Sequence, residues 1–233
     1  MHANYNGPVC LGKCASHPNC ECDWIACPST PESGVLSHYL LASGSQYRAE
    51  LLKRLNRPFQ QVSPDVDESQ HPNETPTTLS SRLAKTKAYA SAIGEFIAAT
   101  PNHSIVIASD QVAALGNQIL GKPVTLERAR AQLESMRGQS VSFHTSLCMR
   151  NLADGTHFCA LDTTVAKLRS LSTGEIGRYL DADDPLDCAG SFKVESLGIS
   201  LFSSVETTDP TALVGLPMIA VCAGLRQFGL DVP

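Results

Sequence analysis

Residues 104–111 read Ser-Ile-Val-Ile-Ala-Ser-Asp-Gln. Four consecutive apolar residues, rich in β-branched side chains, predict a short buried strand. The strand delivers a carboxylate, Asp110, at its C-terminal end, which is the edge where open α/β sheets bind ligands. Because Asp is also common at the start of turns, this stretch alone leaves a catalytic and a turn-forming role equally open.

The length and charge of the chain limit what it can be. Its 233 residues suffice for one large domain or for two small lobes that share a cleft. The net charge of -5 argues against general binding to nucleic acid or to anionic membranes, but it leaves room for a local basic pocket. No apolar run reaches the length of about 18 residues that a membrane helix needs. We therefore expect no nucleic-acid partner and no membrane partner.

The cysteines fall into two groups. Residues 1–34 are rich in Cys but lack both a periodic apolar pattern and a Cys-x-x-Cys pair of the usual zinc type. We expect an unstructured extension there, with a zinc module or a misassigned start codon as alternatives, and a single domain over residues 35–233. The remaining cysteines stand among apolar neighbours, so we expect buried thiols in a cytoplasmic protein; they are Cys148, Cys159, Cys188 and Cys222.

Strands and helices alternate in the first half of the chain, and a hairpin follows in the second half. Apolar runs and turn residues predict strands over residues 35–42, 59–62, 104–111, 141–150, 157–169 and 199–205. Helical spacing and capping residues predict helices over residues 46–55, 76–100, 125–138, 172–180 and 215–229. This order predicts an α/β protein whose mixed sheet is flanked by helices.

Cationic and small polar side chains gather around the predicted turns. Ser45 is the expected N-cap of a helix whose free N–H groups favour an anion, and Arg48 adds a guanidinium suited to bidentate phosphate contact. In the helix over residues 76–100, the helical period places Lys87 toward a cleft and Lys85 toward solvent. The predicted anion-binding residues are Ser43, Ser45, Arg48, Lys87, Lys122 and Lys193.

Two carboxylates, Glu68 and Asp110, accompany these cations as candidate site residues. Glu68 ends an acidic run, which is usually a solvated loop but also offers the oxygen ligands that magnesium prefers. Cations together with a few acids suit a metal–polyphosphate substrate, in which one carboxylate orients or deprotonates a water molecule. We therefore expect a divalent cation, Mg²⁺ or Mn²⁺, with Glu68 and Asp110 as its ligands.

Several segments resemble motifs of the Maf family, in the family's order. They are residues 41–52, 66–68, 82–88, 109–111, 121–123 and 214–217, within a similarity that covers about residues 35–228. The resemblance implies an elongated α/β fold with two lobes around a central cleft, often as a homodimer. It also implies a metal-dependent hydrolase that converts nucleoside triphosphates to monophosphates and pyrophosphate, with Asp110 as the proton acceptor.

Three positions that sort substrates in the family match Tyr47, Gln111 and Glu195. The segment over residues 188–195 resembles the subfamily that acts on 7-methyl-GTP, rather than the branch that acts on dTTP and UTP. The carboxylate of Glu195 can accept hydrogen bonds from a guanine edge, and the ring of Tyr47 can stack on a cationic purine. Tyr47 stands where that subfamily usually has Trp, a stronger cation–π partner.

Two other functions stay open on the sequence. One is pyrophosphate release from dTTP or UTP. The other is a non-catalytic, nucleotide-binding regulator of septum formation, which the family's association with cell-division arrest implies. The three functions share the same pocket and differ in whether Asp110 and Glu195 are needed.

Overall fold

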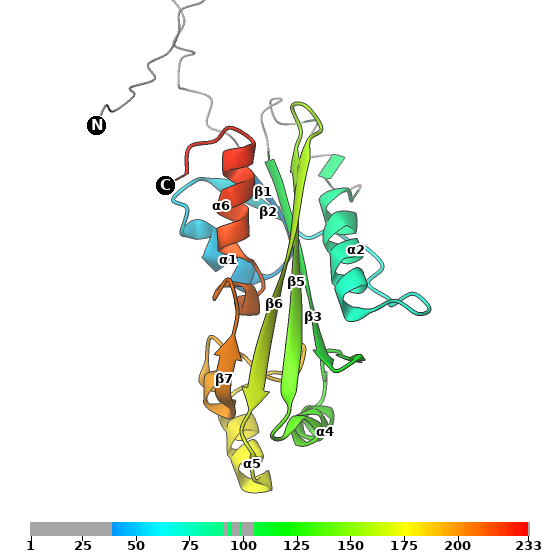
Figure 1. The fold of residues 1–233 in the computed structure, drawn as a ribbon, viewed down its shortest axis with the longest axis vertical. Helices are drawn as coiled ribbons and strands as arrows, with labels where there is room; N and C mark the ends of the chain where they lie inside the picture. The colour runs from blue at the N-terminus through cyan, green and yellow to red at the C-terminus, as the bar shows by residue number, and fades with distance from the viewer. Residues whose placement is uncertain (1–38, 91–92, 95–97, 99–104, 233) are drawn as a thin grey trace, which may run out of the picture. The chain divides into compact units, whose positions relative to one another are not determined.

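The computed structural model describes residues 39–90, 93–94, 98 and 105–232. The chain divides into two units, Met1–Val35 and Leu36–Pro233, and all of the described residues belong to the second unit. The predictions for residues 1–34 therefore lie outside the described residues. The second unit is a mixed α/β structure with helices on both faces of one sheet (Figure 1).

The sheet has seven strands in the order β2-β1-β3-β5-β6-β7, with β4 paired to β3. The strand β1 is parallel to β2 and β3, and every other pairing is antiparallel. The predicted mixed sheet is thus confirmed. The strands are β1 (Tyr39–Ala42), β2 (Phe59–Val62), β3 (Ile105–Leu115), β4 (Gln118–Leu120), β5 (Ser140–Asn151), β6 (His157–Leu168) and β7 (Phe202–Glu206).

Capping residues fix where several helices begin. The side chains of Ser45, Thr125 and Ser172 each accept a hydrogen bond from the backbone N–H three residues later, as their sequence context predicts. The helices are α1 (Gln46–Lys53), α2 (Pro76–Ala88), α4 (Leu126–Met136), α5 (Thr173–Ala182) and α6 (Met218–Gln227), and the 3-10 helices are η1 (Leu197–Leu201) and η2 (Ala212–Val214).

The long strands β3, β5 and β6 carry separate hydrophobic groups along their length. Ala113 and Phe143 pack with α4 and α5 in one lobe. In the other lobe, Ile107 packs with α1 and α6, and its neighbour Val106 packs with α2. Alternate residues of a strand point to opposite faces, which explains why α2 lies across the sheet from α1 and α6 (Figure 1). The helices thus form two lobes on one continuous sheet.

The position of Asp110 in its strand differs from the prediction. The strand β3 does not end near Asp110 but continues to Leu115, because β5 pairs with it over nearly its whole length. On the opposite edge of β3, the pairing with β1 stops at Ile107, and the pairing with β4 starts only at Ala113. Residues 108–112 therefore have no strand partner on that edge among the described residues, and Asp110 lies in this gap.

Two further element boundaries differ from the prediction. The helix expected over residues 76–100 ends at Ala88; Tyr89 is its C-cap, and the ring of Tyr89 lies 4.8 Å from the Arg150 guanidinium. The strand expected over residues 199–205 begins at Phe202, after η1. A side chain at Gly198 would come within 2.4 Å of the Lys193 carbonyl oxygen, so η1 packs tightly against that loop. Such tertiary contacts leave no periodic pattern in the sequence from which these boundaries could be predicted.

The cysteines of the described region are free thiols, but they are not all buried. Cys148 is buried, and this burial raises its pKa to about 12. Cys159 faces it from β6 but is exposed, and Cys188 and Cys222 are partly exposed. The expectation of four buried thiols is therefore wrong for three of them.

No described helix combines the length and the apolar character needed to cross a bilayer.

Candidate active site

A pocket of about 560 Å³ lies between the two lobes, over the gap in the edge of β3. Its volume is in the range of small-ligand sites. The structure brings nearly all of the predicted site residues into its lining: Ser43, Ser45, Tyr47, Arg48, Glu68, Lys87, Asp110, Gln111, Lys122 and Glu195. The exception is Lys193, which is not part of the lining; its Nζ atom lies 3.6 Å from Oδ1 of Asp187.

The centre of the pocket is a lysine held between two acids. The Nζ atom of Lys87 lies 2.6 Å from Oδ1 of Asp110 and 2.5 Å from Oε1 of Glu68. Burial raises the pKa of Asp110, and the charge of Lys87 opposes this rise only in part. Burial also acts to raise the pKa of Glu68, but the hydrogen bond and charge of Lys87, together with the charges of Lys122 and Arg48, lower it overall. The predicted orientations are confirmed, since Lys87 is buried and Lys85 is exposed.

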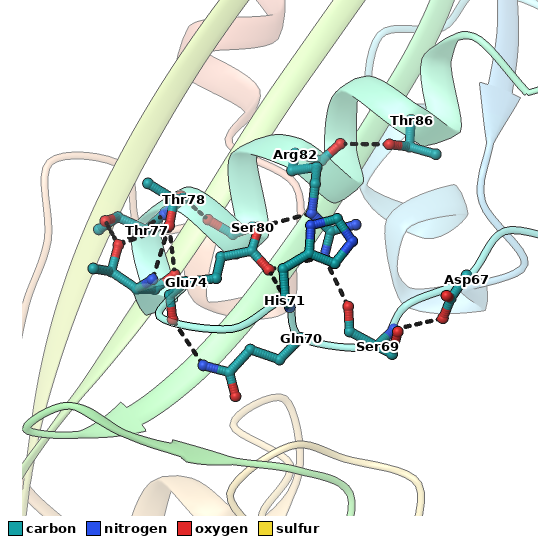
Figure 2. Close-up of polar contacts among 11 residues, drawn as sticks. Asp67, Ser69, Gln70, His71, Glu74, Thr77, Thr78, Ser80, Arg82 and Thr86 are labelled. Atoms are coloured by element: carbon teal, nitrogen blue, oxygen red, sulfur yellow. Dashed lines mark hydrogen bonds and ion pairs between the residues drawn. The ribbon is translucent and has the colours of Figure 1, made fainter.

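An arginine of α2 holds the loop that carries Glu68. Figure 2 shows Arg82 joined to Glu74 and Ser69 beside this loop. The Nε and Nη2 atoms of Arg82 donate to the two carboxylate oxygens of Glu74 at 2.7 and 2.9 Å. Nη2 also donates to the Ser69 carbonyl at 2.8 Å. Because Ser69 follows Glu68 directly, this arginine fixes the backbone from which Glu68 reaches Lys87.

The pair of Arg82 and Glu74 gives a prediction for stability against pH. Arg82 lowers the pKa of Glu74 to about 2 from its ordinary value of 4.5. The pair therefore stabilises the fold above pH 4.5, and its contribution is lost as the pH falls through about 2. We expect Arg82→Met to lower the thermal midpoint by a few degrees at pH 7 and by less near pH 3, as measured by circular dichroism.

The exposed Arg128 provides a matched control, because no ion pair involves it in the described part of the chain. Arg128→Met should leave the midpoint unchanged at both pH values. A midpoint difference for Arg82→Met that stayed constant between pH 7 and pH 3 would show that the ion pair contributes nothing.

Arg48 connects three segments around the pocket. Its Nε atom donates to the Gly215 carbonyl at 2.8 Å, and Nη1 donates to the Ser109 carbonyl at 2.8 Å and to Oγ of Ser43 at 3.1 Å. These bonds occupy two of the three guanidinium nitrogens. Nη2 therefore remains for a ligand, in place of the contact through two nitrogens that the sequence suggested.

The first turn of α1 adds backbone donors to the same region. The hydroxyl of Ser45 caps the Arg48 N–H at 3.4 Å, and the hydroxyl of Ser43 accepts from the Ser45 N–H at 3.2 Å. The first N–H groups of an α-helix have no partner within the helix, so those of Gln46 and Tyr47 are suited to an anion. Lys122 lines the same pocket, so this lysine and the helix start form a side of the pocket that is rich in positive charge and N–H donors.

Aromatic and acidic side chains form the other end of the pocket. The ring of Phe192 lies edge-on between Phe143 and Phe202, with centroid distances of 5.2 and 4.7 Å. Burial raises the pKa of Glu195, which lines the pocket together with Tyr47. This end can therefore hold a flat ring and accept hydrogen bonds from its edge.

The side chain of Gln111 is held in place by hydrogen bonds from its amide nitrogen to other residues of the protein. Its Nε2 atom donates to Oγ1 of Thr145 at 3.0 Å and to the carbonyls of Ala212 and Leu213 at 2.9 and 3.1 Å. With its amide nitrogen held in this way, Gln111 presents Oε1 as the atom for a ligand. Gln111 is therefore suited to accept a hydrogen bond and not to bind an anion.

Sequence reasoning missed four residues of the lining, Ser63, Phe143, Asp187 and Leu213, of which Asp187 and Phe143 are instructive. Asp187 directly precedes the segment of residues 188–195, so a carboxylate next to that segment could have been predicted to lie in the site. Phe143 follows the ordinary alternation of its strand, and nothing in the sequence separates it from a core residue.

The fold and the pocket define an α/β protein whose cleft has cations and helix N–H groups at one end and aromatic and acidic side chains at the other. A family model described as Maf-like protein matches residues 38–228, and the chain belongs to this family. A 7-methyl-GTP pyrophosphatase of Xanthomonas axonopodis pv. citri (strain 306) is 53% identical over 194 residues, which are 83% of this chain and 98% of that protein.

A second relative is the 7-methyl-GTP pyrophosphatase of Bordetella pertussis (strain Tohama I / ATCC BAA-589 / NCTC 13251). It is 47% identical over 193 residues, which are 82% of this chain and 92% of that protein. Among solved structures, the Staphylococcus aureus Ham1 protein matches with a TM-score of 0.38 at 15% identity, over 57% of this chain and 73% of that chain. This structural similarity is too small to carry an argument.

Proposed function

We propose that the chain is a nucleoside triphosphate pyrophosphatase that hydrolyses 7-methyl-GTP to 7-methyl-GMP and diphosphate. This reaction would remove a modified nucleotide from the nucleotide pool. The observation that carries the proposal is the placement of Asp110 beside Lys87 in one pocket with Arg48 and Lys122. Relatives of about 50% identity that bear the name 7-methyl-GTP pyrophosphatase support the choice of substrate.

The phosphate side of the pocket would hold the triphosphate. Nη2 of Arg48 and the first N–H groups of α1 offer positive charge from one side, and the ammonium of Lys122 adds more from the loop after β4. Neutralising the phosphate oxygens in this way makes the phosphorus open to attack and stabilises the pyrophosphate that leaves.

Asp110 is the residue suited to prime the attacking water. Its Oδ1 atom accepts from Lys87, so Oδ2 is the oxygen that can take a proton. The water oxygen forms a bond to the α-phosphorus as its proton moves to Asp110, and the bond between the α-phosphorus and the bridging oxygen breaks. The raised pKa of Asp110 makes it a stronger base than an ordinary aspartate.

Glu68 and Asp110 are the residues that we propose to hold Mg²⁺ or Mn²⁺. Both carboxylates already meet at one cationic nitrogen, Nζ of Lys87, so they fit a shared cation. When bound, the divalent ion supplies further charge neutralisation at the phosphates. The described residues contain no cluster of three or more His, Cys, Asp or Glu suited to a metal. Phosphate oxygens and water would therefore complete its coordination, which is usual for magnesium.

Glu195 would read the base, and its variant tests the substrate. We expect Glu195→Gln to lower kcat/KM for 7-methyl-GTP by about 10- to 100-fold, because a hydrogen bond to a charged acceptor is lost. The same variant should change kcat/KM for UTP much less. A competition assay of 7-methyl-GTP against dTTP and UTP measures both effects.

The control is Glu206→Gln, an exposed glutamate of β7 outside the pocket, which should behave like the wild type. If Glu195→Gln kept the full preference for the methylated purine, Glu195 would not be the base reader. If the wild type preferred dTTP or UTP, the pyrimidine alternative would replace 7-methyl-GTP.

We further propose that the reaction takes place in the cytoplasm, a reducing compartment in which thiols such as those of the described region stay free. The homodimer and the regulator of septum formation remain predictions. The regulator would need the pocket but not the base Asp110. Loss of hydrolysis on substitution of Asp110 would therefore support the pyrophosphatase over the non-catalytic regulator.

A further inference from the structure

Two loops supply the two ends of the pocket, and one side chain joins them. The first loop carries Gly121 and Lys122, and the second carries Ser191 and Glu195. Gln132, on α4, donates from Nε2 to the Gly121 carbonyl at 3.0 Å. Its Oε1 atom accepts from the hydroxyl of Ser191 at 2.5 Å. Gln132 itself is not part of the pocket lining, so any effect on a ligand must act through these loops.

Both loops hold an unusual backbone conformation close to these contacts. Val124 has a φ of +66° and Ser191 has a φ of +64°. Residues other than glycine, and β-branched ones above all, adopt such values only where their surroundings enforce them. The Val124 N–H donates to the Leu186 carbonyl at 3.2 Å, which is a second direct link between the loops. The relative position of the loops is thus fixed at a conformational cost.

We propose that Gln132 is a positioning residue that sets the distance between Lys122 and Glu195, the phosphate-binding and base-reading side chains. The assignment of these ends rests on the proposed function. A nucleotide must contact both ends at once, and binding at one end then depends on how well the other end is placed. A ligand that contacts only the phosphate end does not sense that distance.

The test compares a whole nucleotide with pyrophosphate alone. We expect Gln132→Ala to lower kcat/KM about tenfold for the nucleotide that the wild type hydrolyses fastest, mostly through KM. Its dissociation constant for pyrophosphate, measured by calorimetry, should stay within about twofold of the wild type. The use of the fastest nucleotide separates this test from the choice of 7-methyl-GTP as substrate.

Gln139→Ala is the matched control, because the Nε2 atom of Gln139 donates only to the Ser135 carbonyl of α4 and touches neither loop. This variant should match the wild type. Gln132→Glu keeps the length of the side chain but loses the donor to Gly121, so it should be as impaired as Gln132→Ala. Ser191→Ala removes the other bond and should raise KM in the same direction.

The combined variant decides whether the two bonds act as one link. Gln132→Ala with Ser191→Ala should be no worse than the more impaired single variant, because both changes break the same connection. Wild-type KM in the two single variants, or an equal weakening of pyrophosphate and nucleotide binding, would overturn the positioning role. Thermal unfolding of each variant confirms that it is folded, and Ser191→Ala keeps the test decisive if Gln132→Ala unfolds.

Discussion

Asp110→Asn should lower kcat for pyrophosphate release by about 10²–10⁴-fold, the usual contribution of a general base. The amide keeps the size of the side chain but cannot take a proton from water. Lys122, Arg48 and the start of α1 are untouched, so the dissociation constant for the nucleotide should change little. Single-turnover kinetics with 7-methyl-GTP and calorimetric titration of the nucleotide measure the two quantities separately.

Asp162→Asn is a matched control for this substitution. Asp162 is as buried as Asp110, each being 6% exposed, but it lies on β6 outside the pocket lining. It should retain kcat within a few-fold of the wild type. Equal turnover by Asp110→Asn and the wild type would remove Asp110 from the chemistry.

Lys87→Met should lower kcat near neutral pH by about 10²–10³-fold, in line with the loss of one preorganised charge at a reaction centre. Lys87 is the main group that opposes the rise of the Asp110 pKa caused by burial. Its removal should raise that pKa further, so less of the base is ionised at a given pH. Lys87 also joins Asp110 to Glu68, so the variant removes a positive charge from between the two proposed metal ligands.

The pH profile of kcat/KM tests this reasoning, because the rate rises with pH as Asp110 loses its proton. We expect the acidic limb of the wild type to lie above the ordinary aspartate value of 3.8, and that of Lys87→Met to lie higher still. Lys85→Met, two residues away on the exposed side of α2, is the control. An acidic limb that did not move in Lys87→Met would contradict the coupling of Lys87 to Asp110.

Local chemistry made much of the fold predictable. The hydroxyls of Ser45, Thr125 and Ser172 mark helix starts because a cap acts on N–H groups only three residues away. The orientation of Lys87 followed from the helical period alone. The hairpin of β5 and β6 followed from alternating residues on either side of a turn.

Tertiary contacts decided the features that could not be predicted. The length of β3 depends on β5, which is distant in sequence and pairs well past Asp110. The contact of Gly198 with the Lys193 backbone favours a 3-10 helix where the residue types suggest a strand. For the same reason the sequence placed Lys193 among the phosphate ligands, whereas its ammonium lies near Asp187. A residue type reveals what a side chain can bind, but not which neighbour reaches it.

The products formed from 7-methyl-GTP with Mg²⁺ or Mn²⁺ test the account most directly. Separation of the reaction mixture by ion-exchange chromatography should give 7-methyl-GMP and pyrophosphate in equal amounts with the wild type. Asp110→Asn should give neither product above the enzyme-free level. Release of a nucleoside diphosphate with orthophosphate, or undiminished products from Asp110→Asn, would contradict the account.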